Sequence, residues 1–149
     1  MLRHYRLQVQ TQQHLRPGEG GPYRSVSPET AFQQVDFPYL VAGDFNIDNP
    51  ASDPLRIFSY SEELESAPYY SMASDRGYRL LNTPGVYTRF PLSGPHSPGA
   101  IDLAFSNPSM SPVFVDWDTT SLPSTGSDHM PILIILASPT EKPLPRIPC

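Results

Sequence analysis

The apolar positions of this chain gather into short runs, and the clearest runs end at polar residues. Residues 40–46 read LVAGDFN, a run rich in strand formers that is followed by a break at Asn49-Pro50. We therefore predict a buried strand that presents polar side chains at its C-terminal tip. Because side chains alternate along a strand, Asp44 and Asn46 should share one side while Phe45 points into a core.

Two later apolar runs carry acidic residues in a similar way. Residues 100–106 read AIDLAFS, so that Asp102 interrupts an apolar strand, and residues 126–131, GSDHMP, open a third run over residues 132–136. A carboxylate inside an apolar strand is costly unless a partner satisfies it. Three acidic positions at strand ends, one of them followed by His129, favour a shared site over three unrelated turns.

Helical signals are confined to two stretches. Residues 27–36 begin with a capping serine and a first-turn proline and predict one short helix, and residues 59–76 predict two helical pieces separated by Pro68. Alternating stretches at residues 86–90 and 113–117 bring the expected total to about five strands. We predict an α/β (α+β) fold with a mixed or antiparallel sheet and helices on one face.

The flanks lack such patterns. Residues 1–26 mix Gln, Arg, His and Gly with little periodicity, and residues 138–149 carry four prolines. We expect a flexible lead-in over residues 1–26, a single domain over residues 27–137, and a Pro-rich disordered tail over residues 138–149.

Composition narrows the functional classes. The formal net charge of −5 argues against a broad basic face that binds nucleic acid, although cations bound at an acidic site can bring phosphate to it. Cys149 is the only cysteine, so a disulfide framework is excluded. No apolar run approaches the ~20 residues that cross a bilayer. We expect an intracellular protein of the nucleus or cytoplasm that makes no membrane contact.

The residue types leave two interpretations of the polar tips open. A carboxylate and an amide oxygen at Asp44 and Asn46 suit a hard divalent cation or a phosphate-bound water, whereas an Asx turn would use them to bond their own backbone. Asp102 could likewise cap a neighbouring backbone group, and His129 could be a satisfied buried histidine.

The motifs GDFN, IDL and SDH, at residues 43–46, 101–103 and 127–129, resemble in this order the endonuclease/exonuclease/phosphatase family of DNase I-like phosphodiesterases. The likeness is greatest to the endonuclease domains of fungal non-LTR retroelements and runs from about Ser27 to Ala137. It implies that the chain is the C-terminal half of a four-layer α/β sandwich.

The resemblance also implies roles in cutting a phosphodiester bond. Asp44 would position or deprotonate the attacking water, and Asn46 would hold a phosphate oxygen. His129 would form a hydrogen bond to the phosphoryl oxygen or take part in proton transfer. Asp102 would orient the His129 ring. Asp128 would contribute to binding Mg²⁺, with Mn²⁺ as a substitute.

By the same resemblance, residues 82–89 would lie near the scissile phosphate. Thr88 and Arg89 would then contact substrate. An edge strand with a solvated arginine is the alternative interpretation.

The sequence departs from the family pattern at its N-terminal end. Nothing in residues 1–36 matches the strands that supply an Asn and the metal-anchoring Glu in the family, so Mg²⁺ binding should be weak. We expect a truncated, impaired endonuclease domain that acts on DNA. The apolar side chains of residues 40–45 and 132–136 should be exposed unless helices or a second copy of the chain cover them, and self-association or a partner chain that supplies the missing half is possible. Two alternatives remain, a non-catalytic binding module that uses this face and a small-molecule phosphatase.

Overall fold

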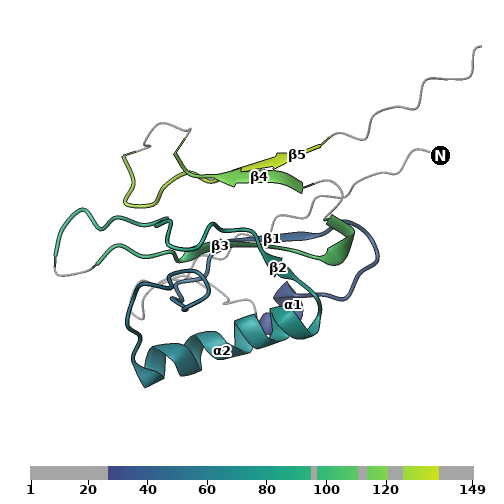
Figure 1. Ribbon diagram of the computed structural model, residues 1–149, viewed down its shortest axis with the longest axis horizontal. Coiled ribbons are helices and arrows are strands. Elements are labelled where there is room, and N and C mark those ends of the chain that lie inside the picture. The colour runs from purple at the N-terminus through teal and green to yellow at the C-terminus, as the bar shows by residue number, and fades with distance from the viewer. Residues whose placement is uncertain (1–26, 95–96, 111–113, 121–125, 138–149) are drawn as a thin grey trace, which may run out of the picture.

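The computed structural model describes residues 27–94, 97–110, 114–120 and 126–137, so the lead-in and the tail predicted from the sequence lie outside the described residues. The described elements form three layers, with a three-stranded sheet between two helices on one side and a two-stranded sheet on the other (Figure 1). The predicted α+β class with helices on one face of a sheet is confirmed.

The central sheet consists of β1 (Leu40–Asp44), β3 (Asp102–Ser106) and β2 (Arg79–Leu80), in the order β1-β3-β2. Both pairings are antiparallel, and all five residues of β3 are buried. In the register of β1 with β3, Asp44 stands directly opposite Asp102. Directly opposed residues in antiparallel strands have neighbouring side chains, so the pairing itself brings these two carboxylates together.

The second sheet pairs β4 (Phe114–Asp118) with β5 (Leu133–Leu136), antiparallel, with an irregularity between Phe114 and Asp116. The strands therefore form two sheets, whereas the sequence pattern led us to expect one. The reason is that β3 is apolar on both faces, so each face must pack against another layer of structure that shields it from water. The buried residues of the cluster associated with this interface are Leu40, Leu81, Ala104, Met110 and Trp117.

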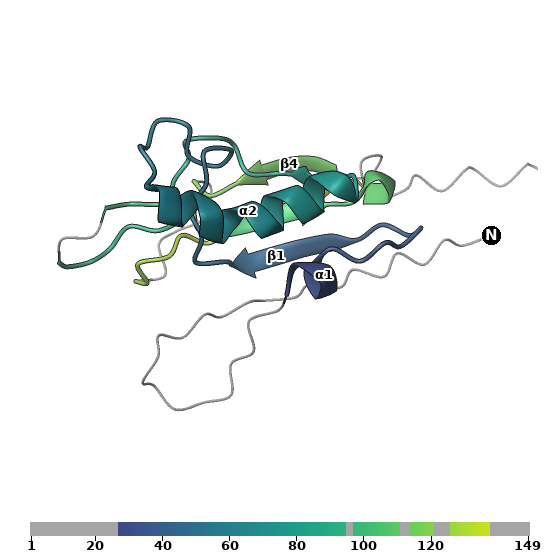
Figure 2. The same ribbon diagram turned by 90° about the horizontal axis from the view of Figure 1, so that it is seen from below.

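The helices α1 (Pro28–Ala31) and α2 (Tyr60–Asp75) lie along the opposite face (Figure 2), and a short 3₁₀ helix, η1 (Pro108–Met110), follows β3. Helix α1 ends earlier than predicted, because Phe32 leaves the helical conformation and is fully buried against Tyr78 and Phe105.

Helix α2 is continuous, so the prediction of two pieces separated by Pro68 is wrong. A capping box at Ser59 starts the helix. Just beyond the proline, Tyr69 packs edge-on against Phe45 and Tyr70 against Phe105. These contacts hold the second half of the helix on the sheet and outweigh the loss of one backbone hydrogen bond at the proline.

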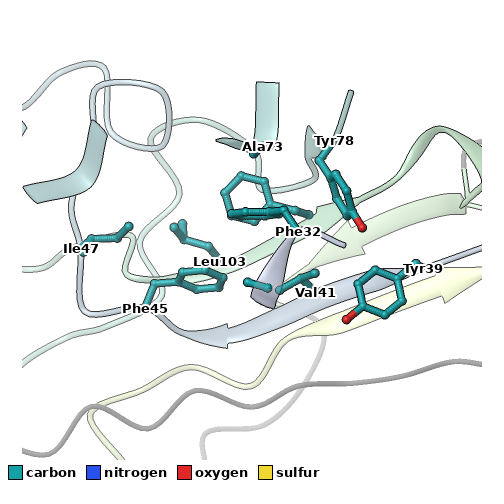
Figure 3. Close-up of a cluster of buried hydrophobic side chains, with 10 residues drawn as sticks. Phe32, Tyr39, Val41, Phe45, Ile47, Ala73, Tyr78 and Leu103 are labelled. Carbon is teal, nitrogen blue, oxygen red and sulfur yellow. The ribbon is translucent and has the colours of Figure 1, made fainter. Parts of the chain in front are cut away.

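Aromatic rings dominate the core between the helices and the central sheet (Figure 3). Phe45 is 4% exposed and contacts Phe105 and Tyr69, which confirms the predicted inward direction of its side chain. With Phe45 fixed inside, the two polar residues that flank it are held on the other side of the strand tip.

At β1 and the residue after it, the helices and the second sheet bury Leu40, Val41 and Phe45, which is the cover by helices that the expectation allowed. On β5, Ile135 is 41% exposed and its neighbours are half-buried. The part of the chain that the structure describes contains no helix long and apolar enough to cross a membrane.

Candidate active site

Asp44, Asp102 and His129 meet at one end of the central sheet. Nδ1 of His129 lies 2.9 Å from Oδ2 and 3.0 Å from Oδ1 of Asp102. One potential ligand atom from each of the three residues lies within 4.8 Å of the other two, and among the described residues this is the one such group of His, Cys, Asp or Glu. The fold thus unites residues that are far apart in the sequence into one polar cluster.

The backbone around Asp102 is held by two buried side chains. Asp102 N donates to Thr88 Oγ1 (2.9 Å), and Asn82 Nδ2 donates to the carbonyl oxygen of Asp102 (2.9 Å). Asn82 Oδ1 also accepts from Ala104 N (2.8 Å). Because these bonds satisfy backbone groups, the carboxylate of Asp102 remains available to His129.

The tip of β1 forms the Asx turn, one of the two interpretations that the sequence left open, and the cation or phosphate role stays a prediction. Asn46 N donates to Asp44 Oδ1 (2.9 Å), as in an Asx turn, and Asn46 Nδ2 donates to Asp44 Oδ2 (3.2 Å). Asn46 adopts a left-handed backbone conformation with φ 51°, which asparagine tolerates better than most residues. The turn therefore presents the Asn46 side chain beside Asp44 at the exposed end of the strand.

Asp128 and His129 are attached to the segment that carries Arg89. Nε of Arg89 donates to Asp128 Oδ2 (3.0 Å), and Phe90 N donates to the carbonyl oxygen of Asp128 (2.7 Å). Asp128 Oδ1 lies 3.9 Å from His129 Nε2. Arg89 is a half-buried partner of the cluster, so the interpretation as a solvated edge arginine is wrong.

The electrostatics differ between the acidic residues. Burial raises the pKa of Asp44, the charge of Asp102 adds to this, and the Asn46 backbone hydrogen bond, His129 and Arg89 oppose it. The hydrogen bond from Arg89 holds the pKa of Asp128 below its usual value. Asp44 therefore takes up a proton more readily than Asp128 does, and a bound cation would offset the cost of its charged form.

The donor set fits a hard divalent cation in part. Carboxylate oxygens of Asp44 and Asp102 are ligands that Mg²⁺ and Mn²⁺ accept, whereas Nδ1 of His129 is already bonded to Asp102. Asp128 lies beside this three-residue group and shares one oxygen with Arg89, so its predicted metal role stays a prediction.

Asp44, Asp102 and His129 meet in this group, Asn46 is bonded to Asp44, and Asp128 lies beside His129. The sequence did not reveal what supports them. Asn82 and Thr88 are both buried and bond the backbone of Asp102. Polar residues within apolar surroundings, as in LLNT at residues 80–83, are the signal that marks such buried supports.

The described fold and cluster define a phosphodiesterase-like α+β domain. The family model of the endonuclease/exonuclease/phosphatase family matches residues 4–129, and the chain belongs to this family, as its motifs indicated. The match includes residues 4–26, which lie outside the described residues. The family generally depends on divalent metal ions.

One solved structure shows the same fold, and a second is reported beside it. The endonuclease domain of TRAS1, a telomere-specific non-LTR retrotransposon, superposes with a TM-score of 0.51 at 17% identity over 73% of this chain and 44% of that domain. A 3′ phosphatase from Neisseria bound to product DNA hairpin follows with a TM-score of 0.48 at 20% identity, over 68% of this chain and 46% of that one. The chain spans less than half the length of either structure. A search among curated proteins gave no match.

Proposed function

We propose that this chain is a metal-dependent phosphodiesterase domain of the endonuclease type, of retroelement origin, that acts on DNA in the nucleus or cytoplasm. The observation that carries the proposal is the convergence of Asp44 and Asp102 with His129, which joins two carboxylates and an imidazole within 4.8 Å. Family membership supports the reaction class.

His129 is the group that handles charge on the phosphate. Its Nδ1 is held by Asp102, which fixes the orientation of the ring, and its Nε2 is left to bond a phosphoryl oxygen. A proton held at Nε2 can be donated to that oxygen as negative charge develops on it.

Asp44 and Asn46 act on the other side of the reacting phosphate. With its raised pKa, Asp44 can accept the proton of an attacking water, and the Asn46 amide can donate to a phosphate oxygen. A Mg²⁺ or Mn²⁺ ion held by Asp44 and Asp102, with Asp128 as the further ligand predicted from the sequence, would polarise the phosphate and stabilise the leaving oxygen.

We further propose that the isolated chain is an impaired enzyme. Mg²⁺ requires well-placed carboxylates and loses its water reluctantly. In the described part of the chain, Asp128 is already engaged by Arg89, which leaves Asp44 and Asp102 as the carboxylates of the three-residue group. The net charge of −5 also repels phosphate wherever no cation intervenes.

A supercoiled-plasmid nicking assay with Mg²⁺ or Mn²⁺ tests both proposals. We expect slow nicking that Asp44→Ala and His129→Ala each reduce by about 10²-fold or more, since general acid–base groups contribute that much. Asp75→Ala, which removes an exposed carboxylate at the end of α2, serves as the matched control and should leave nicking unchanged.

The outcomes separate the alternatives. Fast nicking that both variants abolish would contradict impairment, and nicking that both retain would contradict the site. Release of inorganic phosphate from small phosphoesters without nicking would favour a phosphatase. Activity in neither assay would favour a non-catalytic binding module that uses the half-covered face of β5.

A further inference from the structure

Arg89 brings a fixed positive charge to the acidic residues of the candidate site. Its side chain is half-buried, and its Nε donates to Asp128 Oδ2 (3.0 Å). Its charge also reaches Asp44, because burial and Asp102 raise the pKa of Asp44 while Arg89 is among the groups that lower it. The guanidinium therefore lies beside the carboxylates that would serve a bound cation.

The backbone keeps this segment next to Asp128 without help from the Arg89 side chain. Phe90 N donates to the carbonyl oxygen of Asp128 (2.7 Å), and Arg89 forms an antiparallel bridge with His129. Because these contacts are made by main-chain atoms, a substitution of the Arg89 side chain should leave Asp128 and His129 in place.

The ion pair and a divalent cation compete for the same carboxylate. Mg²⁺ and Mn²⁺ prefer several oxygen ligands, and the three-residue group supplies the carboxylates of Asp44 and Asp102. Asp128 is the next acid, since its Oδ1 lies 3.9 Å from Nε2 of His129. Arg89 holds its other oxygen and repels a divalent cation, and a guanidinium does not lose its charge in proteins.

We propose that Arg89 is a positioning residue that withholds Asp128 from a divalent cation and thereby lowers the cation affinity of the site. The inference rests on the proposed function, because it takes the acidic cluster as the place where the cation binds. It adds that one side chain of the neighbouring segment limits this binding. Removal of the guanidinium therefore strengthens cation binding through Asp128.

Isothermal titration of the full chain with Mn²⁺, without DNA and at constant ionic strength, tests the proposal. Arg89→Gln removes the charge and should tighten Mn²⁺ binding about tenfold or more. Arg89→Lys keeps the charge and should give no such gain. Asp128→Asn added to Arg89→Gln should remove the gain, because the released carboxylate is then absent.

Arg79→Gln is the matched control. Arg79 is exposed on β2 and pairs with Ser106, at the end of β3 opposite to Asp102, so the substitution removes the same charge away from the site. It should leave the Mn²⁺ affinity unchanged. An equal gain in Arg79→Gln would show that net charge controls cation binding, and the proposal would be overturned.

Other results would also overturn the proposal. Mn²⁺ binding that is equal in the unaltered chain and Arg89→Gln, or absent from both, is one, and a gain that survives in the double variant is another. If Arg89→Gln fails to fold, Arg89→Met is measured by the same criteria. Failure of both variants to fold would show that Arg89 serves the fold, which overturns its role in cation binding.

Plasmid nicking by the same variants separates this inference from the proposed function. Tighter Mn²⁺ binding in Arg89→Gln without nicking in any variant would contradict the nuclease function and support the role of Arg89. Nicking by the unaltered chain, with no gain in Mn²⁺ affinity in Arg89→Gln, would overturn only the role of Arg89.

Discussion

At the scale of single residues, the sequence predicts the polar groups of the candidate site but not their partners. Asp44, Asp102 and His129 stand out because each lies within or at the end of an apolar run. A polar side chain there is costly to bury unless it has a partner. The pairing of Arg89 with Asp128, 39 positions away, depends on the fold and has no local signature. Thr88 was predicted to contact substrate, whereas the structure buries it as an acceptor for Asp102 N.

The paired carboxylates of Asp44 and Asp102 predict a pH dependence of stability. Because the pKa of Asp44 is raised above 3.8, the folded protein keeps a proton that the unfolded chain has lost in the interval between the two values. The free energy of unfolding should therefore fall as the pH rises through that interval. Asp102→Asn removes one of the two causes, so the fall should become smaller.

Carboxyl NMR titration of Asp44, with urea unfolding between about pH 3 and pH 7, measures both quantities. Asp75→Asn, at an exposed position on α2, is the control and should leave the titration of Asp44 unchanged. An Asp44 that titrates at or below 3.8 in the unaltered chain would refute the assigned effects of burial and Asp102.

At the scale of elements, strand positions were predicted more closely than helix extents. Apolar runs in the sequence mark the positions of β1 and β3, because a strand that is buried on both faces needs such a run. The register between these two strands brings the site residues together. The extents of α1 and α2 were decided by packing. Phe32 turns into the core and ends α1, while Tyr69 and Tyr70 anchor α2 beyond its proline. Ring contacts across the fold are not encoded in a local window of sequence.

The continuous α2 predicts that Pro68→Ala stabilises the protein. Pro68 is exposed, and a proline in a helix interior is about 3 kcal/mol less favourable than alanine, so a gain of about 1–3 kcal/mol in the free energy of unfolding is expected. Urea denaturation measures it.

The control for this substitution is Ser71→Ala, at an exposed position on the same helix, which should change stability by less than about 0.5 kcal/mol. A loss of stability in Pro68→Ala would mean that the proline shapes the helix so that Tyr69 and Tyr70 reach the sheet.

At the scale of the whole molecule, the arrangement of strands in two layers could not be read from the sequence. The pattern shows that β3 is apolar on both faces, but it does not show which segment covers each face. The structure assigns one face to the helices and the other to β4 and β5, through the cluster that includes Leu40 and Trp117. The layer that β4 and β5 form over the central sheet is only two strands wide, because within the described residues these strands pair only with each other.

Within the described residues, the outer edges of β4 and β5 have no partner strand, and this predicts self-association. In the described residues β5 has one partner strand, and Ile135 on it is 41% exposed, so a second chain can add to the edge and bury this side chain. Sedimentation velocity should show association that increases with concentration. Ile135→Lys should weaken it roughly tenfold or more, since a lysine on an edge strand opposes pairing.

Leu55→Lys provides the matched control, because Leu55 is 87% exposed but lies in the loop before α2, away from the β5 edge. If both substitutions weaken association equally, exposed apolar side chains in general drive it and the edge does not. A compact monomer at high concentration would show that β4 and β5 are sufficiently covered within one chain, and the expectation of an incomplete sandwich would then be wrong.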